Sequence, residues 1–225
     1  MDRIVIIVLL SFNFLVTPGQ SNCEKCQEKF KNKDFLKAKD VCLKASEVGD
    51  PICQAYLGII YLSESDTYNA KIWFEKSANQ GNPIGENGLG YLYQSGNGGL
   101  SEDTVKANEW FLKSALQGNS DSQFWLGENL FISGNKTEGY KWTSKASLNG
   151  SRDAQYNLGA MLYNGDGIEK NDSLAIIWFI ISTTNGNKKS KSFIDDLRLK
   201  ISDEKFKNYF KIAADFADKN PQIIN

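Results

Sequence analysis

One pattern recurs four times along this chain and restricts the folds that it can adopt. A Leu-Gly dipeptide returns at intervals of 32, 37 and 32 residues, a tryptophan follows each dipeptide, and a glycine closes each unit. The anchors of the four units are Leu57, Trp73 and Gly81; Leu89, Trp110 and Gly118; Leu126, Trp142 and Gly150; and Leu158, Trp178 and Gly186. A period of roughly 33 to 45 residues is typical of helical hairpins that stack into a solenoid.

Each unit is predicted to form two antiparallel helices, as the fourth unit illustrates. Residues 153–164 carry apolar side chains every three to four positions, which places them on one helical face. Gly-Asp-Gly at 165–167 ends this helix, and the polar residues at 171–173 offer N-caps for a second helix that ends at Gly186. No segment alternates for long enough to form a strand. The chain is therefore predicted to be all-α, with about twelve helices in antiparallel pairs.

The same unit carries a family resemblance. Residues 154–168 read Ala-Gln-Tyr-Asn-Leu-Gly-Ala-Met-Leu-Tyr-Asn-Gly-Asp-Gly-Ile, and residues 175–179 read Ala-Ile-Ile-Trp-Phe. This pattern resembles the Sel1-like repeat family, whose members are relatives of tetratricopeptide repeats. The resemblance implies a right-handed α/α solenoid of helix hairpins. It covers the four units 49–81, 82–118, 119–150 and 151–186.

The units are not identical. The first and third lack the long glycine-containing loop of the other two, and Thr143 replaces the Phe that follows Trp elsewhere. Residues 22–48 are predicted to form a shortened hairpin that caps one end of the solenoid, and residues 187–225 are predicted to cap the other with helices at 192–200 and 202–219. Caps are expected because the end repeats of a solenoid would otherwise expose their core.

Residues 1–21 have the layout of a secretory signal peptide. Arg3 precedes an apolar stretch at 4–16, and a Pro-Gly pair follows at 18–19. A membrane anchor is the weaker alternative, because the stretch is shorter than the roughly 20 apolar residues that span a bilayer. We expect cleavage after Gly19 or Ser21 and a periplasmic or secreted mature chain without stable membrane insertion. Export together with the family resemblance suggests a Gram-negative bacterium.

The four cysteines all lie in the first quarter of the chain. An even number in an exported protein predicts two disulfides, one within the capping hairpin and one that joins this hairpin to the first full repeat. If its turn is centred between residues 32 and 33, Cys23 and Cys42 are equidistant from it, so we expect Cys23–Cys42 and Cys26–Cys53. The pairing Cys26–Cys42 with Cys23–Cys53 requires a tilt between the helices and stays open, as do free thiols and metal ligation.

A groove for a protein partner is the function that the repeats favour. The first helices of stacked hairpins usually line the concave side, and aromatic side chains provide much of the binding energy at interfaces. Ordinary packing between neighbouring helices is the competing interpretation, whereas the four recurrent tryptophans are expected in the core. The predicted partner-binding residues are Tyr91, Gln94, Phe124, Trp125, Glu128, Phe131, Tyr156 and Tyr163. We expect a monomer in the unbound state.

The composition argues against several functions. The chain contains no histidine, which excludes a Ser-His-Asp triad, a Cys-His dyad and a His-based zinc helix. Lys and Arg total 26 against 27 Asp and Glu, so a net charge of −1 gives no reason to expect nucleic acid as a partner. We expect no metal and no cofactor.

Enzymatic activity is not expected, but one alternative stays open. Some relatives with a cystine in each repeat resemble β-lactamases or penicillin-binding proteins, and Ser-x-x-Lys occurs here at 133–136 and 202–205. The accompanying Lys-Thr-Gly and Ser-Asp-Asn motifs are absent, so the set is incomplete. The narrower form of the favoured function is a periplasmic immunity protein that inhibits a secreted toxin. The alternative is a hydrolase of the β-lactamase type.

Overall fold

The computed structural model describes residues 18–32 and 35–224. Over these residues the chain forms twelve α-helices, one short 3-10 helix and no strand, which confirms the predicted all-α class. The helices are α1 (Pro18–Lys31), α2 (Phe35–Glu47), α3 (Pro51–Ser63), α4 (Thr67–Ala78), α5 (Pro83–Ser95), α6 (Thr104–Leu116), α7 (Ser120–Ile132), α8 (Lys136–Leu148), α9 (Arg152–Asn164), α10 (Asp172–Thr184), α11 (Lys188–Arg198) and α12 (Asp203–Lys219), followed by η1 (Pro221–Ile223).

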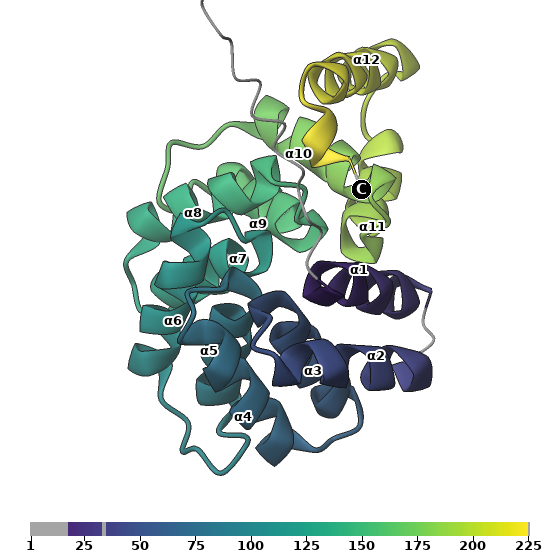
Figure 1. The fold of residues 1–225 in the computed structure, drawn as a ribbon. Helices are drawn as coiled ribbons and strands as arrows, with labels where there is room; N and C mark the ends of the chain where they lie inside the picture. Colours follow the sequence, from purple (N-terminus) through teal and green to yellow (C-terminus); the bar gives the residue numbers. More distant parts are fainter. Residues whose placement is uncertain (1–17, 33–34, 225) are drawn as a thin grey trace, which may run out of the picture.

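The helices pack as consecutive hairpins. Helices α3 and α4, α5 and α6, α7 and α8, and α9 and α10 form the four repeat hairpins, and each second helix also packs on the first helix of the next unit. Figure 1 shows the hairpins following one another around an arc, with α3, α5, α7 and α9 on its inner side and α4, α6 and α8 on its outer side. The first helices of the repeats therefore follow one another along the inner side of the arc.

The recurring glycines have two distinct structural roles. The glycine that closes each unit has a left-handed backbone, as at Gly81 (φ +74°), and so turns the chain into the next hairpin. In the first, second and fourth units the glycine of the Leu-Gly dipeptide instead makes room for a phenylalanine ring of the second helix, whereas Gly127 of the third unit faces Thr143. A Cβ at Gly58 would lie 2.6 Å from Phe74, and a Cβ at Gly159 would lie 2.9 Å from Phe179. The Leu-Gly glycines are thus packing positions between the two helices of a hairpin, and the closing glycines are turning positions.

A hydrogen-bond ladder joins neighbouring units through one buried position of each inner helix. Gln54, Gln123 and Gln155 each donate from Nε2 to the carbonyl oxygen eight residues earlier, at 3.0–3.2 Å. Each also accepts at Oε1 from an amide nitrogen at the end of its unit, at 2.8–2.9 Å. The second unit has Glu86 at this position, and Glu86 retains only the accepting bond, from Gln117.

The recurrent tryptophans differ in burial. Trp178 is buried, as predicted. Trp73, Trp110 and Trp142 pack against buried clusters but are themselves only half-buried, so the core prediction holds for them in part. The lysine three residues further on lies above each ring at 3.9–4.1 Å, a cation–π arrangement. In the fourth unit a buried isoleucine takes the place of that lysine.

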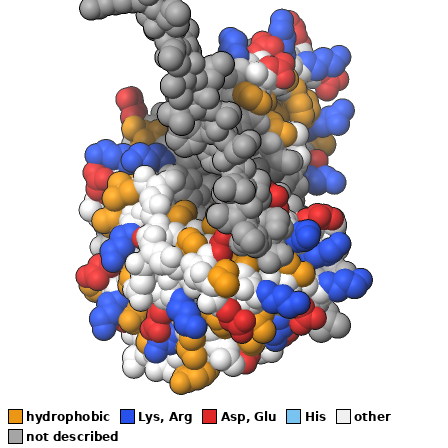
Figure 2. Space-filling model, in the orientation of Figure 1, with side chains coloured by type: hydrophobic (Ala, Val, Ile, Leu, Met, Phe, Trp, Pro, Cys, Tyr) orange, Lys and Arg blue, Asp and Glu red, His pale blue; other side chains and the backbone are white. Residues whose placement is uncertain are grey.

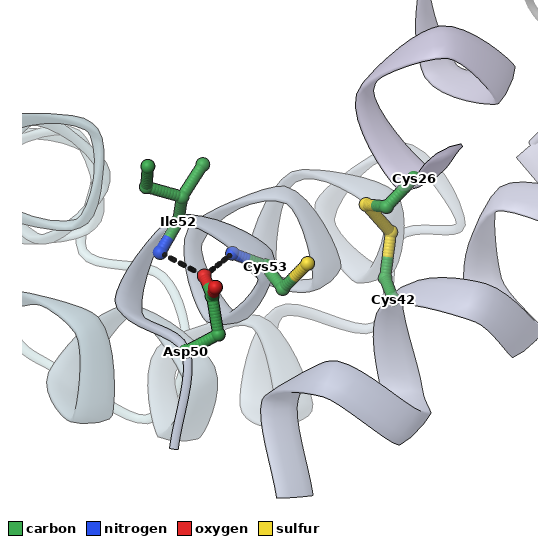
Figure 3. Close-up of a disulfide and its surroundings, with 5 residues drawn as sticks. All are labelled: Cys26, Cys42, Asp50, Ile52 and Cys53. Atoms are coloured by element: carbon green, nitrogen blue, oxygen red, sulfur yellow. Dashed lines mark hydrogen bonds between the residues drawn. A yellow bond between two sulfur atoms is a disulfide. The ribbon is translucent and has the colours of Figure 1, made fainter. Parts of the chain in front are cut away.

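The disulfide pairing predicted for the capping hairpin is wrong. The structure contains a bond between Cys26 and Cys42, with their Cα atoms 5.1 Å apart, in place of the expected Cys23–Cys42 and Cys26–Cys53 (Figure 3). The equidistance argument failed because every Cβ tilts toward its own helix N-terminus. In an antiparallel pair the facing residue on the first helix must therefore lie closer to the turn than its partner does. Cys26 lies closer to the turn between α1 and α2 than Cys42 does.

The expected signal peptide, residues 1–21, lies outside the described residues except for its last four positions, which begin α1. Among the described helices, none has both the length and the hydropathy that crossing a bilayer requires. At the other end α11 begins at Lys188, four residues before the predicted start, because the Asn187 side chain caps it by accepting a hydrogen bond from the Ser190 backbone N–H.

Candidate partner-binding groove

The inner helices place most of the predicted binding residues in two adjoining cavities. We call the larger one the α7–α9 groove. It has a volume of about 620 Å³ and lies between α7, α9 and the start of α11. Its lining consists of Phe124, Trp125, Glu128, Arg152, Asp153, Tyr156, Asn157, Gly186, Asn187, Lys188 and Lys189. Four of the eight predicted residues therefore share this groove.

Aromatic rings form the apolar part of the groove. The Phe124 and Trp125 rings meet edge to face with their centroids 5.3 Å apart. Trp125 also stacks on the buried Phe111 at 6.5 Å, and Tyr156 packs against the buried Phe179 at 5.7 Å. Both interpretations thus apply at once to Trp125 and Tyr156, because each of these two rings packs on a buried phenylalanine and also lines the groove.

Charged and amide side chains surround these rings. Asn187 donates from Nδ2 to the Asp153 carboxylate at 2.9 Å, and the Lys189 ammonium lies 5.7 Å from the centre of the Tyr156 ring. The groove therefore offers aromatic faces beside charges of both signs, which is the composition of a surface that binds protein segments.

The smaller cavity lies between α7, α8 and α9, and we call it the Thr143 pocket. It has a volume of about 280 Å³. Its lining residues are Glu128, Phe131, Thr143, Asn157, Ala160, Met161, Asn164 and Asp166, so it shares Glu128 and Asn157 with the groove. It brings Phe131, a fifth predicted residue, next to the other four.

Three predicted residues lie elsewhere. Tyr163 is 43% exposed and lines a separate cavity of about 510 Å³ with Phe193 and Tyr209. Tyr91, which is 39% exposed, and Gln94 line neither the α7–α9 groove nor the Thr143 pocket. The Gln94 side chain instead accepts a hydrogen bond from Asn129 at 2.9 Å.

Sequence reasoning missed the groove residues that come from helix starts. Arg152 opens α9, and Lys188 and Lys189 open α11, which was expected to begin at residue 192. The Asn-Gly-Asn sequence at 185–187 was the available signal, since Asn187 is an N-cap.

Figure 2 shows Lys and Arg interspersed with Asp and Glu over the visible face, in keeping with the near-neutral net charge.

The two Ser-x-x-Lys segments have other contacts. The Ser133 hydroxyl donates to the Leu130 carbonyl oxygen at 2.9 Å, while Lys136 pairs with Asp166 at 2.6 Å. Ser202 is the N-cap of α12 and accepts from the Lys205 backbone N–H at 3.3 Å. In neither segment is the lysine ammonium engaged with the serine hydroxyl.

Cys23 and Cys53 remain as buried thiols beside the capping disulfide. Their sulfur atoms and an oxygen of the Asp50 carboxylate all lie within 4.8 Å of one another, and no other such group of three occurs among the described residues. A hydrogen bond with Cys23 and burial together raise the pKa of the Cys53 thiol far above its usual range. Asp50 caps α3 by accepting from Ile52 and Cys53 N–H at 2.9 Å (Figure 3).

Comparison with known proteins identifies the repeats. The sequence model of the Sel1 repeat family matches residues 51–82, 83–119, 120–151 and 152–187. No curated protein sequence matches the chain.

Solved structures show the same fold. A Sel1 repeat protein from Oxalobacter formigenes superposes with a TM-score of 0.63 at 25% identity, covering 72% of this chain and 49% of that one. The protective antigen c5321 of uropathogenic Escherichia coli, described as displaying an SLR fold, gives 0.54 at 22% identity, with 90% and 54% covered. A Sel1 repeat protein from Klebsiella pneumoniae gives 0.54 at 20%, with 79% and 92% covered. The chain thus spans about half the length of the first two.

Proposed function

This chain belongs to the Sel1 repeat family, and on that premise we propose that it is an interaction module that holds a segment of a partner protein in the α7–α9 groove. Helical solenoids of this family are typically protein-interaction scaffolds. The observation that carries the proposal is the position of Phe124, Trp125 and Tyr156 in one groove of about 620 Å³ on the inner row of helices.

The physical support comes from the kind of side chains that line the groove. Aromatic residues that are already held by core packing lose little freedom when a partner binds, so they serve as binding hot spots. Arg152, Lys188 and Lys189 at the groove surface provide charge that fixes the orientation of a bound segment.

Peptide selection tests this proposal. A displayed library of random peptides is enriched on the full mature chain, and the affinity of the best peptides is measured by calorimetry. Tyr156→Ala should weaken binding by about tenfold or more, because truncated hot spots cost roughly 2 kcal/mol or above. Tyr68→Ala, on the outer helix α4 and 65% exposed, is the matched control and should bind like the wild type. Enriched peptides that bind Tyr156→Ala undiminished would contradict the groove.

The proposed location is the periplasm or the exterior. It is supported by the signal-peptide layout of residues 1–21 and by the Cys26–Cys42 disulfide, which is typical of an oxidising compartment. Fractionation of expressing cells, with mass spectrometry of the mature N-terminus, tests it. A cytoplasmic chain that keeps Met1 would contradict it.

The narrower proposal is that the partner is a secreted toxin and the module its inhibitor. Its support is the expected export together with a groove of a size that suits one partner segment. Protection of cells that co-express the chain with a toxin from a neighbouring gene tests this role, and Tyr156→Ala should lose the protection. If the Tyr156→Ala variant protected the cells as well as the wild type does, the inhibition would not depend on the α7–α9 groove.

We also propose that the module catalyses no reaction. The hydrogen bond of Ser133 to a carbonyl oxygen and the ion pair of Lys136 support this, because a catalytic Ser-x-x-Lys pair needs the lysine beside the serine hydroxyl. Hydrolysis of a chromogenic β-lactam that is lost in Ser133→Ala would favour the hydrolase alternative instead.

A further inference from the structure

The Thr143 pocket exists because the third repeat lacks a side chain that the other repeats have. In the first unit the Phe74 ring lies between Gly58 of its own hairpin and Gly88 of the next, so a Cβ at either glycine would collide with it. In the second unit Phe111 likewise packs on the Leu-Gly glycine and on Trp125 of the next hairpin. The ring therefore fills the junction between neighbouring hairpins.

The third unit fills this junction differently. Thr143 takes the place of the ring, and Gly139 takes the place of the alanine found at that position in the other units. With two small residues, α8 approaches α7 backbone to backbone. A Cβ at Gly127 would lie 2.9 Å from the Thr143 nitrogen, and a Cβ at Gly139 would lie 2.9 Å from the Gly127 oxygen. The space toward α9 that a ring would occupy is left as the pocket of about 280 Å³.

The lining of this pocket has a distinct chemistry. Phe131, Ala160 and Met161 form apolar walls, while Glu128 and Asp166 supply carboxylates. Asp166 already pairs with Lys136 at 2.6 Å, and this contact lowers the pKa of its carboxyl. Glu128 accepts one long hydrogen bond, 3.3 Å from Asn157, and has no ion-pair partner among the described residues. Lys136 is not among the lining residues, and its ammonium lies at the Asp166 side, 5.2 Å from the centre of the Phe131 ring.

We propose that the Thr143 pocket binds a lysine or arginine side chain of the partner segment, with the methylene stem against Phe131 and Met161 and the charged head at Glu128. The inference rests on the proposed function and names the partner's anchor. Basic side chains bury their stems on apolar surface and keep their heads at polar groups. A purely apolar anchor would leave Glu128 desolvated without compensation, and an acidic anchor would be repelled by it.

The pocket can be tested without knowing the partner. The isotope-labelled mature chain is titrated with n-butylguanidinium, a stem and head without a peptide, and binding is followed by NMR shifts of Asn157, Ala160 and Met161. Saturable shifts at these residues are the expected result. Butyrate and butanol, which match the stem but not the charge, should cause none. Absence of shifts with butylguanidinium, or equal shifts with butanol, would overturn the inference.

Three variants sharpen the test. Glu128→Gln keeps the shape but removes the charge, and should weaken butylguanidinium binding by about tenfold or more. Thr143→Phe restores the ring of the other repeats and should abolish binding. Glu109→Gln removes the same charge from an exposed position on α6 and should change nothing. If Thr143→Phe does not fold, Glu128→Gln still decides, and unweakened binding by Glu128→Gln would refute the role of the carboxylate.

Selected peptides separate this inference from the proposed function. Peptides that depend on Tyr156 and contain a lysine or arginine should lose about tenfold or more in affinity when that residue becomes norleucine, which keeps the stem but not the charge. Peptides that depend on Tyr156 but show no such loss would leave the groove intact and overturn the pocket. If butylguanidinium binds but no selected peptide depends on Tyr156, the pocket stands as a site for a basic side chain and the groove is overturned.

Discussion

Glu86 occupies a position that the other three repeats give to glutamine, and replacing it by glutamine should stabilise the fold. Glu86 is only 5% exposed. In the other units the amide donates to the carbonyl oxygen eight residues earlier, which for the second unit is that of Ala78. An ionised carboxylate cannot donate, so this bond is missing while a charge is buried. Burial accordingly raises the pKa of the Glu86 carboxyl, an effect that Lys113 and the bond from Gln117 reduce.

The magnitude follows from two contributions. A recovered buried hydrogen bond contributes about 1 kcal/mol net, and the neutral glutamine also avoids the cost of burying a charge whose hydrogen bonding is incomplete. We therefore expect Glu86→Gln to raise the free energy of unfolding by about 1–3 kcal/mol at pH 7. Gln123→Glu is the matched reverse change and should lower it by a similar amount.

The pH dependence gives the sign independently. Because the folded state raises the pKa of Glu86, its contribution is most favourable below the unfolded value of 4.5 and is lost as the pH rises through the folded value. Urea unfolding followed by circular dichroism at pH 4 and pH 7 measures this. The advantage of Glu86→Gln should be small at pH 4 and full at pH 7. A variant that is less stable than the wild type at pH 7 would show that the charge is favourable there and would refute the reasoning.

Three further predictions concern packing and the cysteines. Trp178→Ala should cost about 3–5 kcal/mol of stability, and Trp110→Ala clearly less, because only the first ring is buried; chemical denaturation compares them. Trp125→Ala should lower both stability and peptide affinity, since the ring stacks on the core and lines the groove; an effect on stability alone would remove it from the binding surface. Oxidative refolding of the reduced chain with glutathione should join Cys23 and Cys53 in a second disulfide that stabilises by about 3 kcal/mol; peptide mapping that finds both thiols free would contradict this.

The sequence sufficed for the features that depend on local pattern. The spacing of Leu-Gly, Trp and the closing glycine predicted the helix hairpins because each anchor is a packing or turning position within one unit. The cysteine pairing failed because it depends on the direction of Cβ atoms as well as on spacing. The full burial predicted for Trp110 was not found, because a repeat pattern does not distinguish a ring inside the core from a ring that a lysine side chain covers.

Only part of the groove lining could be predicted from the sequence, because the rest depends on how distant segments pack. Phe124 and Tyr156 follow from the register of the inner helices, but Lys188 enters from a capping helix that lies beside α9 only in three dimensions. The departure at Thr143 was visible in the sequence, yet its consequence was not. Whether a missing ring leaves a pocket or lets the helices close depends on where the backbone moves, and here α8 moved toward α7.

The most direct test of the account is to locate a bound segment on the chain itself. A peptide enriched by selection is added to the isotope-labelled mature chain, and the NMR shifts that change are assigned to residues. We predict that the largest changes fall on Phe124, Trp125 and Tyr156, in the α7–α9 groove. Changes concentrated instead on the half-buried Trp73 and Trp110 of the outer helices would show that the outer face binds and would contradict the account.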